Sequence, residues 1–204
     1  MATTHAVWGM ALALPVIAVA PELAPIALAA GFVGGLFPDL DLYMGHRKTL
    51  HYPVLGPLLA ALAIAIAGLN PTTITIGLAV FVSAAALHPV LDIFGGGLEL
   101  RPWEATSDRG VYSHVHRRWI RPRRTIRYDG SPEDLGFAVV GAAPLFFLDD
   151  ATIGLFILGL LVISSFYVLL RRRLAEAAAV LASVVPAPLV PYVPRRYLTA
   201  HDRR

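Results

Sequence analysis

The sequence predicts an all-α fold: a polytopic helical membrane protein of about six membrane helices, with a basic cytoplasmic loop between the fourth and the fifth. Three observations lead to this fold class. Of the 204 residues, 56% are hydrophobic and only 15% are charged, which is far more apolar than a soluble domain. The apolar residues form long runs. The cations are clustered in the segments between alternate runs, which is typical of a multi-pass membrane protein.

Six apolar runs are expected to form the membrane helices. They cover roughly residues 6–20, 23–37, 52–69, 72–94, 135–148 and 151–170. No basic region precedes the first run, so we expect a retained helix and not a signal peptide. The first, second and fifth runs are shorter than the ~20 residues that cross a bilayer upright, so thinned, interfacial or bundle-buried helices are open alternatives there. Tight turns at Pro21-Glu22, Asn70-Pro71 and Asp149-Asp150 are expected to share one side of the membrane.

All 17 lysine and arginine residues fall on the other side of this alternating arrangement. They are Arg47, Lys48, the eight arginines between Leu98 and Asp134, Arg171, Arg172, Arg173, Arg195, Arg196, Arg203 and Arg204. By the positive-inside rule this side is cytoplasmic. We therefore expect a multi-pass protein of the cell membrane with its N- and C-termini in the cytoplasm.

The same pattern divides the chain into four parts. Residues 1–97 are the four-helix membrane core, 98–134 the arginine- and aromatic-rich cytoplasmic loop, 135–173 two further membrane helices, and 174–204 a basic C-terminal tail. The apolar stretch 174–193 lies between two basic clusters that should share a side. We interpret it as an interfacial segment or a helix extension, because a seventh crossing would separate those clusters.

Seven potential metal ligands converge on the cytoplasmic end of the predicted bundle. His88 and Asp92 are four residues apart, which places both on one helix face, one turn from each other, at a spacing typical of metal ligands. Ionisable side chains this deep in an apolar run cost a few kcal/mol unless they are paired. The full set is His5, Asp39, Asp41, His46, His51, His88 and Asp92.

Each of these residues also has a simpler explanation. His5 near the terminus is compatible with a surface residue or a helix cap, and Asp39 and Asp41 with caps of the next helix. His46 and His51 are compatible with interfacial histidines. The cations between them, Arg47 and Lys48, are interpreted as topology markers.

Taken together, the seven residues predict a site for a divalent metal. The chain has no cysteine, so nitrogen and oxygen must hold the ion. Imidazoles with carboxylates suit zinc first, with manganese or iron(II) as alternatives, and more than four such ligands suit two ions that share a carboxylate. One ion or two are both compatible with the sequence, and hydrolysis is the default chemistry of such sites.

The same residues occur in an ordered set along about the first hundred positions. They are His5, the acids of "PDLD", the histidines of "HRKTLH" and the pair in "HPVLD". This set resembles the YdjM-like family of membrane-associated, metal-dependent hydrolases, described as LexA-regulated inner-membrane proteins. Thr49 is displaced by one position from the family's usual pattern. The arginine-rich loop, with "RPWE" and "RPRR", looks like archaeal members.

The resemblance implies a metal-dependent hydrolase. That family has been linked to the zinc-dependent phospholipase C and nuclease group, an all-helical fold with scattered His and Asp ligands. If the link holds, it implies a phosphoester substrate. The implied metal ligands are His5, Asp39, His46 or His51, His88 and Asp92.

The segment from Leu98 to Asp134 is polar in character. Eight arginines interleave with tryptophan and tyrosine, a composition that fits anionic lipid headgroups or a phosphoester substrate. No recognised nucleic-acid-binding motif accompanies the charge, which argues against nucleic acid as a partner. "VYSHVH" alternates as a strand would, and His114 and His116 are candidate extra ligands. The simpler explanation is a cytoplasmic loop that is basic because of topology.

The sequence therefore favours a membrane-bound hydrolase of a phosphoester or lipid-linked substrate, in which Asp41 or Asp39 serves as base or bridge. One alternative is a non-catalytic scaffold or lipid-binding protein whose helix ends are joined by the metal. A transporter is less favoured, because polar residues are sparse on the non-cytoplasmic side, where Glu22, Asn70, Asp149 and Asp150 are the main ones. The oligomeric state cannot be predicted.

Overall fold

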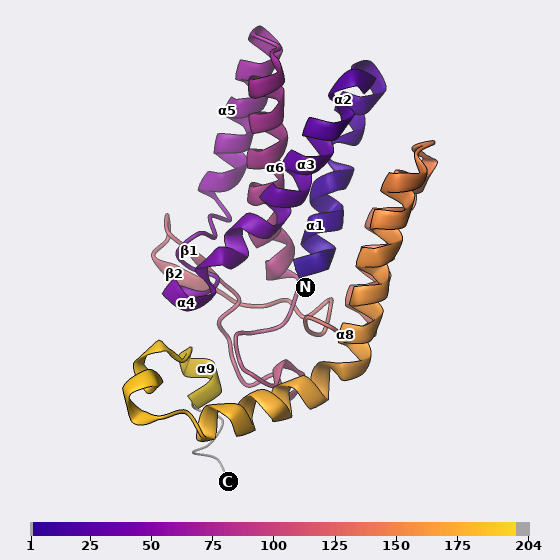
Figure 1. Ribbon diagram of the computed structural model, residues 1–204. Helices are drawn as coiled ribbons and strands as arrows, with labels where there is room; N and C mark the ends of the chain where they lie inside the picture. Colours follow the sequence, from indigo (N-terminus) through magenta and orange to yellow (C-terminus); the bar gives the residue numbers. More distant parts are fainter. Residues whose placement is uncertain (1, 199–204) are drawn as a thin grey trace.

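The computed structural model describes residues 2–198, and helices dominate it (Figure 1). All six predicted apolar runs are helical over most of their length. The helices α1, α3, α5 and α6 pack side by side, and α7 and the first part of α8 pack against them. The principal helices are α1 (Ala2–Ala11), α2 (Leu14–Val19), α3 (Ala24–Leu36), α5 (Leu55–Leu69), α6 (Thr73–Ile93), α7 (Pro132–Ala142) and α8 (Ala151–Ser183).

Within the described residues, four helical segments are long and apolar enough to cross a membrane, so the predicted count of six is not confirmed. They are Ala2–Val19, Pro21–Gly45, Thr73–Ile93 and Ala151–Ser183. Helices α5 and α7 have 15 and 11 residues, and at about 1.5 Å per residue neither reaches the ~30 Å of a bilayer core. The fifth apolar run ends in a 3-10 turn, η4 (Ala143–Phe147), that packs against α1 and α8.

Glycines allow α1 and α3 to approach closely. Gly9 of α1 faces Gly31 of α3, and Gly35 faces the backbone of His5. A Cβ atom at any of these positions would overlap a backbone carbonyl of the other helix. Small residues at helix contacts are a common device of membrane bundles. Here they bring the N-terminal turn of α1 against the C-terminal end of α3.

The apolar core lies between α1, α3, α6, α7 and the N-terminal part of α8. Leu145 and Ile157 are its largest fully buried side chains, and Val7 and Met10 pack in the same cluster. Many large apolar side chains on the outside of the bundle are exposed, which suits helices surrounded by lipid.

The segment between α6 and α7 contains a small antiparallel hairpin in an otherwise helical chain. Its strands are β1 (Val111–Ser113) and β2 (Arg118–Ile120), with Val111 opposite Ile120. The predicted strand in "VYSHVH" is confirmed over β1 only. His114 and His116 lie in the turn, so they do not line one strand face.

Helix α8 continues well past its apolar part. It begins at the predicted Asp149-Asp150 turn, where Asp150 accepts hydrogen bonds from the backbone N–H groups of Thr152 and Ile153. Its last turns swing aside beneath the bundle (Figure 1). The prediction of a helix extension after residue 173 is thus confirmed as far as Ser183. A 3-10 turn, η5 (Ala187–Tyr192), and α9 (Arg195–Leu198) follow, and Arg203 and Arg204 lie outside the described residues.

Candidate metal centre

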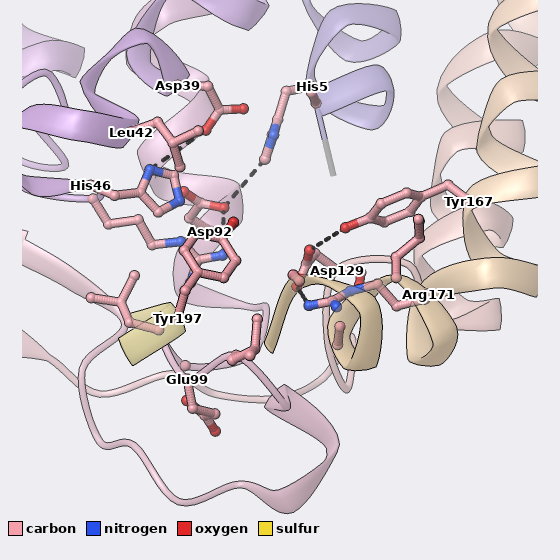
Figure 2. A pocket seen from close by; sticks show the side chains of 18 residues that line it. His5, Asp39, Leu42, His46, Asp92, Glu99, Asp129, Tyr167, Arg171 and Tyr197 are labelled. Atoms are coloured by element: carbon pink, nitrogen blue, oxygen red, sulfur yellow. Dashed lines mark hydrogen bonds and ion pairs between the residues drawn. The ribbon is translucent and has the colours of Figure 1, made fainter. Parts of the chain in front are cut away.

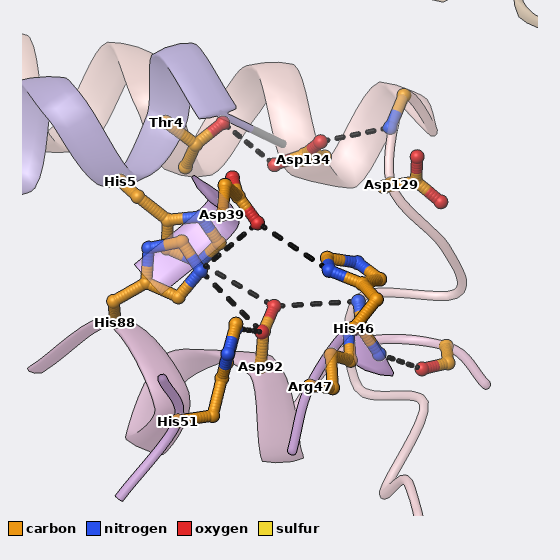
Figure 3. A network of polar contacts seen from close by, with 12 residues as sticks. Thr4, His5, Asp39, His46, Arg47, His51, His88, Asp92, Asp129 and Asp134 are labelled. Carbon is orange, nitrogen blue, oxygen red and sulfur yellow. Dashed lines mark hydrogen bonds and ion pairs between the residues drawn. The ribbon is translucent and has the colours of Figure 1, made fainter. Parts of the chain in front are cut away.

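Three separate parts of the chain deliver acids and histidines to one end of the bundle (Figure 3). Helix α1 carries His5, and α6 carries His88 and Asp92 in its last turns. Between α3 and α5, the 3-10 turn η2 (Phe37–Asp41) has both acids, and the loop after the four-residue helix α4 (Leu42–Gly45) has both histidines. All seven predicted residues therefore lie in one cluster: His5, Asp39, Asp41, His46, His51, His88 and Asp92.

The most deeply buried donors are His51, His88 and Asp92. The Nε2 atoms of His51 and His88 lie 3.3 and 3.5 Å from Oδ2 of Asp92. These three atoms are buried and have no hydrogen-bond partner in the described part of the chain. Donors that share a tetrahedral ion at about 2.0–2.2 Å are ~3.4 Å apart, so the spacing fits a divalent cation. These buried groups can hold a metal ion.

Hydrogen bonds on the far side of each ring turn Nε2 into the cluster. The Nδ1–H of His88 donates to the carbonyl of Gly35 at 2.6 Å, and the Nδ1–H of His51 donates to Oδ2 of Asp41 at 3.0 Å. Because the acceptors are a carbonyl and a carboxylate, Nδ1 must carry a proton, so Nε2 is the nitrogen that can bind a metal ion when the ring is neutral. Metal-binding histidines are oriented by the same kind of bond.

Asp41 is fully buried, and both its oxygens are engaged. Oδ1 accepts a hydrogen bond from Nδ1 of His46 at 3.1 Å. Oδ2 accepts two, from Nδ1 of His51 at 3.0 Å and from the backbone N–H of Leu50 at 3.1 Å. Among residues 2–198, the donor groups that could hold an ion do not include Asp41. Its contacts are those of a carboxylate that orients two imidazoles, whereas the sequence made it a candidate ligand, base or bridge.

Three further donors, His5, Asp39 and His46, surround the innermost group, which consists of His51, His88 and Asp92. Oδ1 of Asp39 lies 3.4 Å from Nε2 of His88 and 4.0 Å from Nδ1 of His46. The His5 ring stacks on His88 with centroids 3.7 Å apart, and its Nε2 lies 3.6 Å from Oδ1 of Asp92. Asp39 is 30% exposed, more than any other member, so the cluster opens at this acid. Two more donor groups result: His5 with Asp39 and His88, and Asp39 with His46 and His51.

Arg47 belongs to the site, so its interpretation as a topology marker alone is wrong. Its side chain is only 9% exposed, Nη1 donates to the carbonyl of Gly96 at 2.7 Å, and Nη2 lies 3.3 Å from Oδ1 of Asp92. The neighbouring Lys48 is exposed, as a topology marker would be. The sequence offered only one signal for Arg47, its position next to His46.

The cluster also affects the protonation of His51. Burial by itself would lower the pKa of His51, but its hydrogen bond to Asp41 and the nearby Asp92 carboxylate outweigh burial and raise that pKa. A metal ion at Nε2 requires the neutral ring, so binding must displace a proton.

A cavity of about 410 Å³ lies beside the cluster (Figure 2). His5, Asp39, His46, Arg47 and Asp92 form its polar end. The part of α8 that continues past its apolar run lines the opposite side of the cavity. Apolar contributions to the lining come from Leu98, Leu100, Leu174, Ala175 and Ala178.

A second polar network lies across the cavity and was not predicted. The Tyr167 hydroxyl donates to Oδ2 of Asp129 at 2.9 Å, and Nε of Arg171 donates to the carbonyl of Asp129 at 3.0 Å. Burial raises the pKa of Asp129, but the guanidinium of Arg171 and the Tyr167 hydroxyl help to hold that pKa below its ordinary value. In the sequence, Arg171 is one of three consecutive arginines, so nothing local distinguishes it.

Comparisons with protein-family models, curated proteins and solved structures give no match. The resemblance to the YdjM-like family therefore stays a prediction. The case for the site rests on geometry.

His114 and His116 lie apart from the cluster. Nε2 of His114 donates to the carbonyl of Lys48 at 2.7 Å, and His116 pairs with the Ser113 hydroxyl at 2.9 Å. Neither belongs to a metal-donor group within the described chain, which is contrary to the extra-ligand hypothesis.

Proposed function

We propose that the protein is a membrane-bound, metal-dependent hydrolase that acts on a phosphoester or lipid-linked substrate at the cytoplasmic face. One observation carries the proposal: unpartnered, buried atoms of His51, His88 and Asp92 converge beside a cavity of about 410 Å³. Buried polar atoms without partners are costly, so natural proteins keep them mainly where a ligand completes them. Bound divalent metal would provide the missing partners.

Zinc is the first candidate for this ion, with manganese or iron(II) as alternatives, because the donors are imidazole nitrogens and carboxylate oxygens. When bound, such an ion polarises a phosphoryl oxygen and activates water. The protein's own contribution is orientation: Asp41 fixes two of the histidines, and Arg47 balances the charge of Asp92. In the net reaction, the oxygen of water bonds to phosphorus, the ester P–O bond breaks, and the leaving oxygen takes a proton.

The cavity supports the substrate class. Its volume lies within the ~300–1,000 Å³ that is usual for small-ligand sites. A charged end with Asp39 and Asp92 adjoins an apolar lining that includes Leu98 and Leu174. Such a lining suits an amphiphile with its anionic head at the metal, and the helices around the site are long and apolar enough to lie in a membrane.

Metal analysis and turnover assays test the proposal together. We expect the purified protein to contain stoichiometric metal and to hydrolyse at least one member of a panel of nitrophenyl phosphates and short-chain phospholipids. His51→Ala and His88→Ala should each lower metal affinity and turnover by about 100-fold or more. His114→Ala is the matched control, since this histidine lies outside the cluster. Purified protein without metal would contradict the proposal.

A non-catalytic scaffold is the second candidate. The observation in its favour is that the ligands come from α1, α6 and the chain between α3 and α5, so an ion would tie three parts of the chain together. Stoichiometric metal without turnover of any substrate in the panel would favour the scaffold over the hydrolase.

A further inference from the structure

The donors of the cluster fall into three overlapping groups, and the overlaps limit how ions can occupy them. The groups are His5 with Asp39 and His88, Asp39 with His46 and His51, and His51 with His88 and Asp92. Within each group the donor atoms lie within 4.8 Å of one another. Asp39 and Asp92 share no group, so the six residues are spread more widely than the donors of one ion.

Each pair of groups shares one residue, and only one shared residue can serve two ions. The first and third groups share His88, and the second and third share His51, but one imidazole nitrogen binds one ion. The first and second groups share Asp39, whose carboxylate has two oxygens and can bridge. A single ion could therefore occupy any one of the three groups, whereas two ions fit only in the first and second groups, bridged by Asp39.

We infer that the cluster holds two divalent cations, one between His5, His88 and Asp39 and the other between His46, His51 and Asp39. This inference rests on the proposed function, because it counts the ions of the same site. Oδ2 of Asp92 lies between one histidine of each ion, 3.3 Å from Nε2 of His51 and 3.5 Å from Nε2 of His88.

Hydrogen bonding supports a separate ion beside His46. Asp41 holds both histidines of that ion by Nδ1, which leaves Nε2 of His46 and of His51 as the coordinating atoms. His46 belongs to neither of the other two groups. A single ion in the innermost group would not contact His46, so the hydrogen bond that orients His46 would have no role in metal binding.

The charge of the site favours two ions for an anionic substrate. Asp39, Asp41 and Asp92 carry three negative charges and Arg47 one positive charge, so these groups sum to about −2 when the imidazoles are neutral, as metal binding requires. One divalent ion would only neutralise this charge. Two ions would leave it positive, which attracts a phosphoester and stabilises charge that develops on its oxygens.

Metal stoichiometry of the full-length protein, reconstituted with Zn²⁺ alone and dialysed, tests the inference. We expect two ions per chain, and one ion per chain in His5→Ala and in His46→Ala, since each change removes a ligand of one ion. His114→Ala should keep two. Circular dichroism and gel filtration show whether each variant is folded.

Electron paramagnetic resonance of the unmutated protein loaded with Mn²⁺ gives a second measurement that needs no variant. Two ions about 3.5–4 Å apart should give an exchange-coupled spectrum. One ion per chain with an uncoupled spectrum, unchanged in His5→Ala and His46→Ala, would overturn the two-ion inference and leave the proposed function standing. No bound ion at all would overturn both.

Discussion

Nη2 of Arg47 lies 3.3 Å from Oδ1 of Asp92, and Nη1 of the same guanidinium donates to the carbonyl of Gly96. Its backbone has a φ of +60°, a left-handed conformation that is uncommon for residues other than glycine. A buried guanidinium therefore compensates a buried carboxylate at the edge of the metal cluster.

Replacing Arg47 tests this pairing. Arg47→Met should lower the free energy of unfolding of the metal-free protein by about 3 kcal/mol, because Asp92 would remain buried without its cation. Thermal unfolding in detergent measures the loss. Lys48→Met is the matched control: its side chain is exposed, so a change within about 0.5 kcal/mol is expected. Equal effects of the two substitutions would contradict the assignment of Arg47 to the site.

At the scale of the elements, the contact between α1 and α3 sets the metal cluster. Gly31 and Gly35 lie one helical turn apart on α3 and face the backbone of α1. Gly35 has a second role, since its carbonyl accepts the Nδ1–H of His88. One turn of α3 thus positions His5 on α1 and orients His88 on α6.

Gly35→Ala should disturb the position of His5 and the orientation of His88 at once. The added methyl group would overlap the carbonyl of His5, so α1 must move away, at a cost of about 1–3 kcal/mol for overpacking. Metal affinity should fall as well, because His5 and His88 shift. Gly159→Ala on α8 is the control, since nothing lies near its added methyl group. Metal titration and thermal unfolding distinguish the two, and unchanged affinity in Gly35→Ala would argue against this role for the α1–α3 contact.

For the whole molecule, the cluster joins the N-terminus, the connection between α3 and α5, and the end of α6. An ion there binds the folded chain, in which the donors are assembled, more tightly than the unfolded chain.

Metal removal should therefore destabilise the protein. At an ion concentration 100 times the dissociation constant, binding adds about 2.7 kcal/mol, so a chelator should lower the melting temperature by several degrees. Adding the metal back should restore it. In His88→Ala, which lacks one metal ligand, the difference between the melting temperatures with and without metal should be smaller. A melting temperature of the unmutated protein that ignores the chelator would contradict a structural contribution of the ion.

Hydropathy was enough to predict the helices, because an apolar run of sufficient length has few alternatives in lipid. The six crossings that it predicts are not confirmed, since four helical segments of the described residues are long and apolar enough to cross. Whether 15 apolar residues in α5 or the run that ends in η4 reach across a bilayer depends on where each helix stops. In α8 the helix continued past its apolar part, and that extension became a wall of the cavity.

The sequence by itself determined that seven His and Asp residues approach one end of the bundle, since alternation of apolar runs is a local and countable property. Only the tertiary structure decided their roles. Asp41 orients rings, Asp39 faces the cavity, and Arg47 turns inward while Lys48 stays outside. The Asp129–Arg171 network across the cavity joins residues 42 positions apart. The physical reason is that side-chain direction, burial and distance between remote segments arise from packing, which no spacing along the chain encodes.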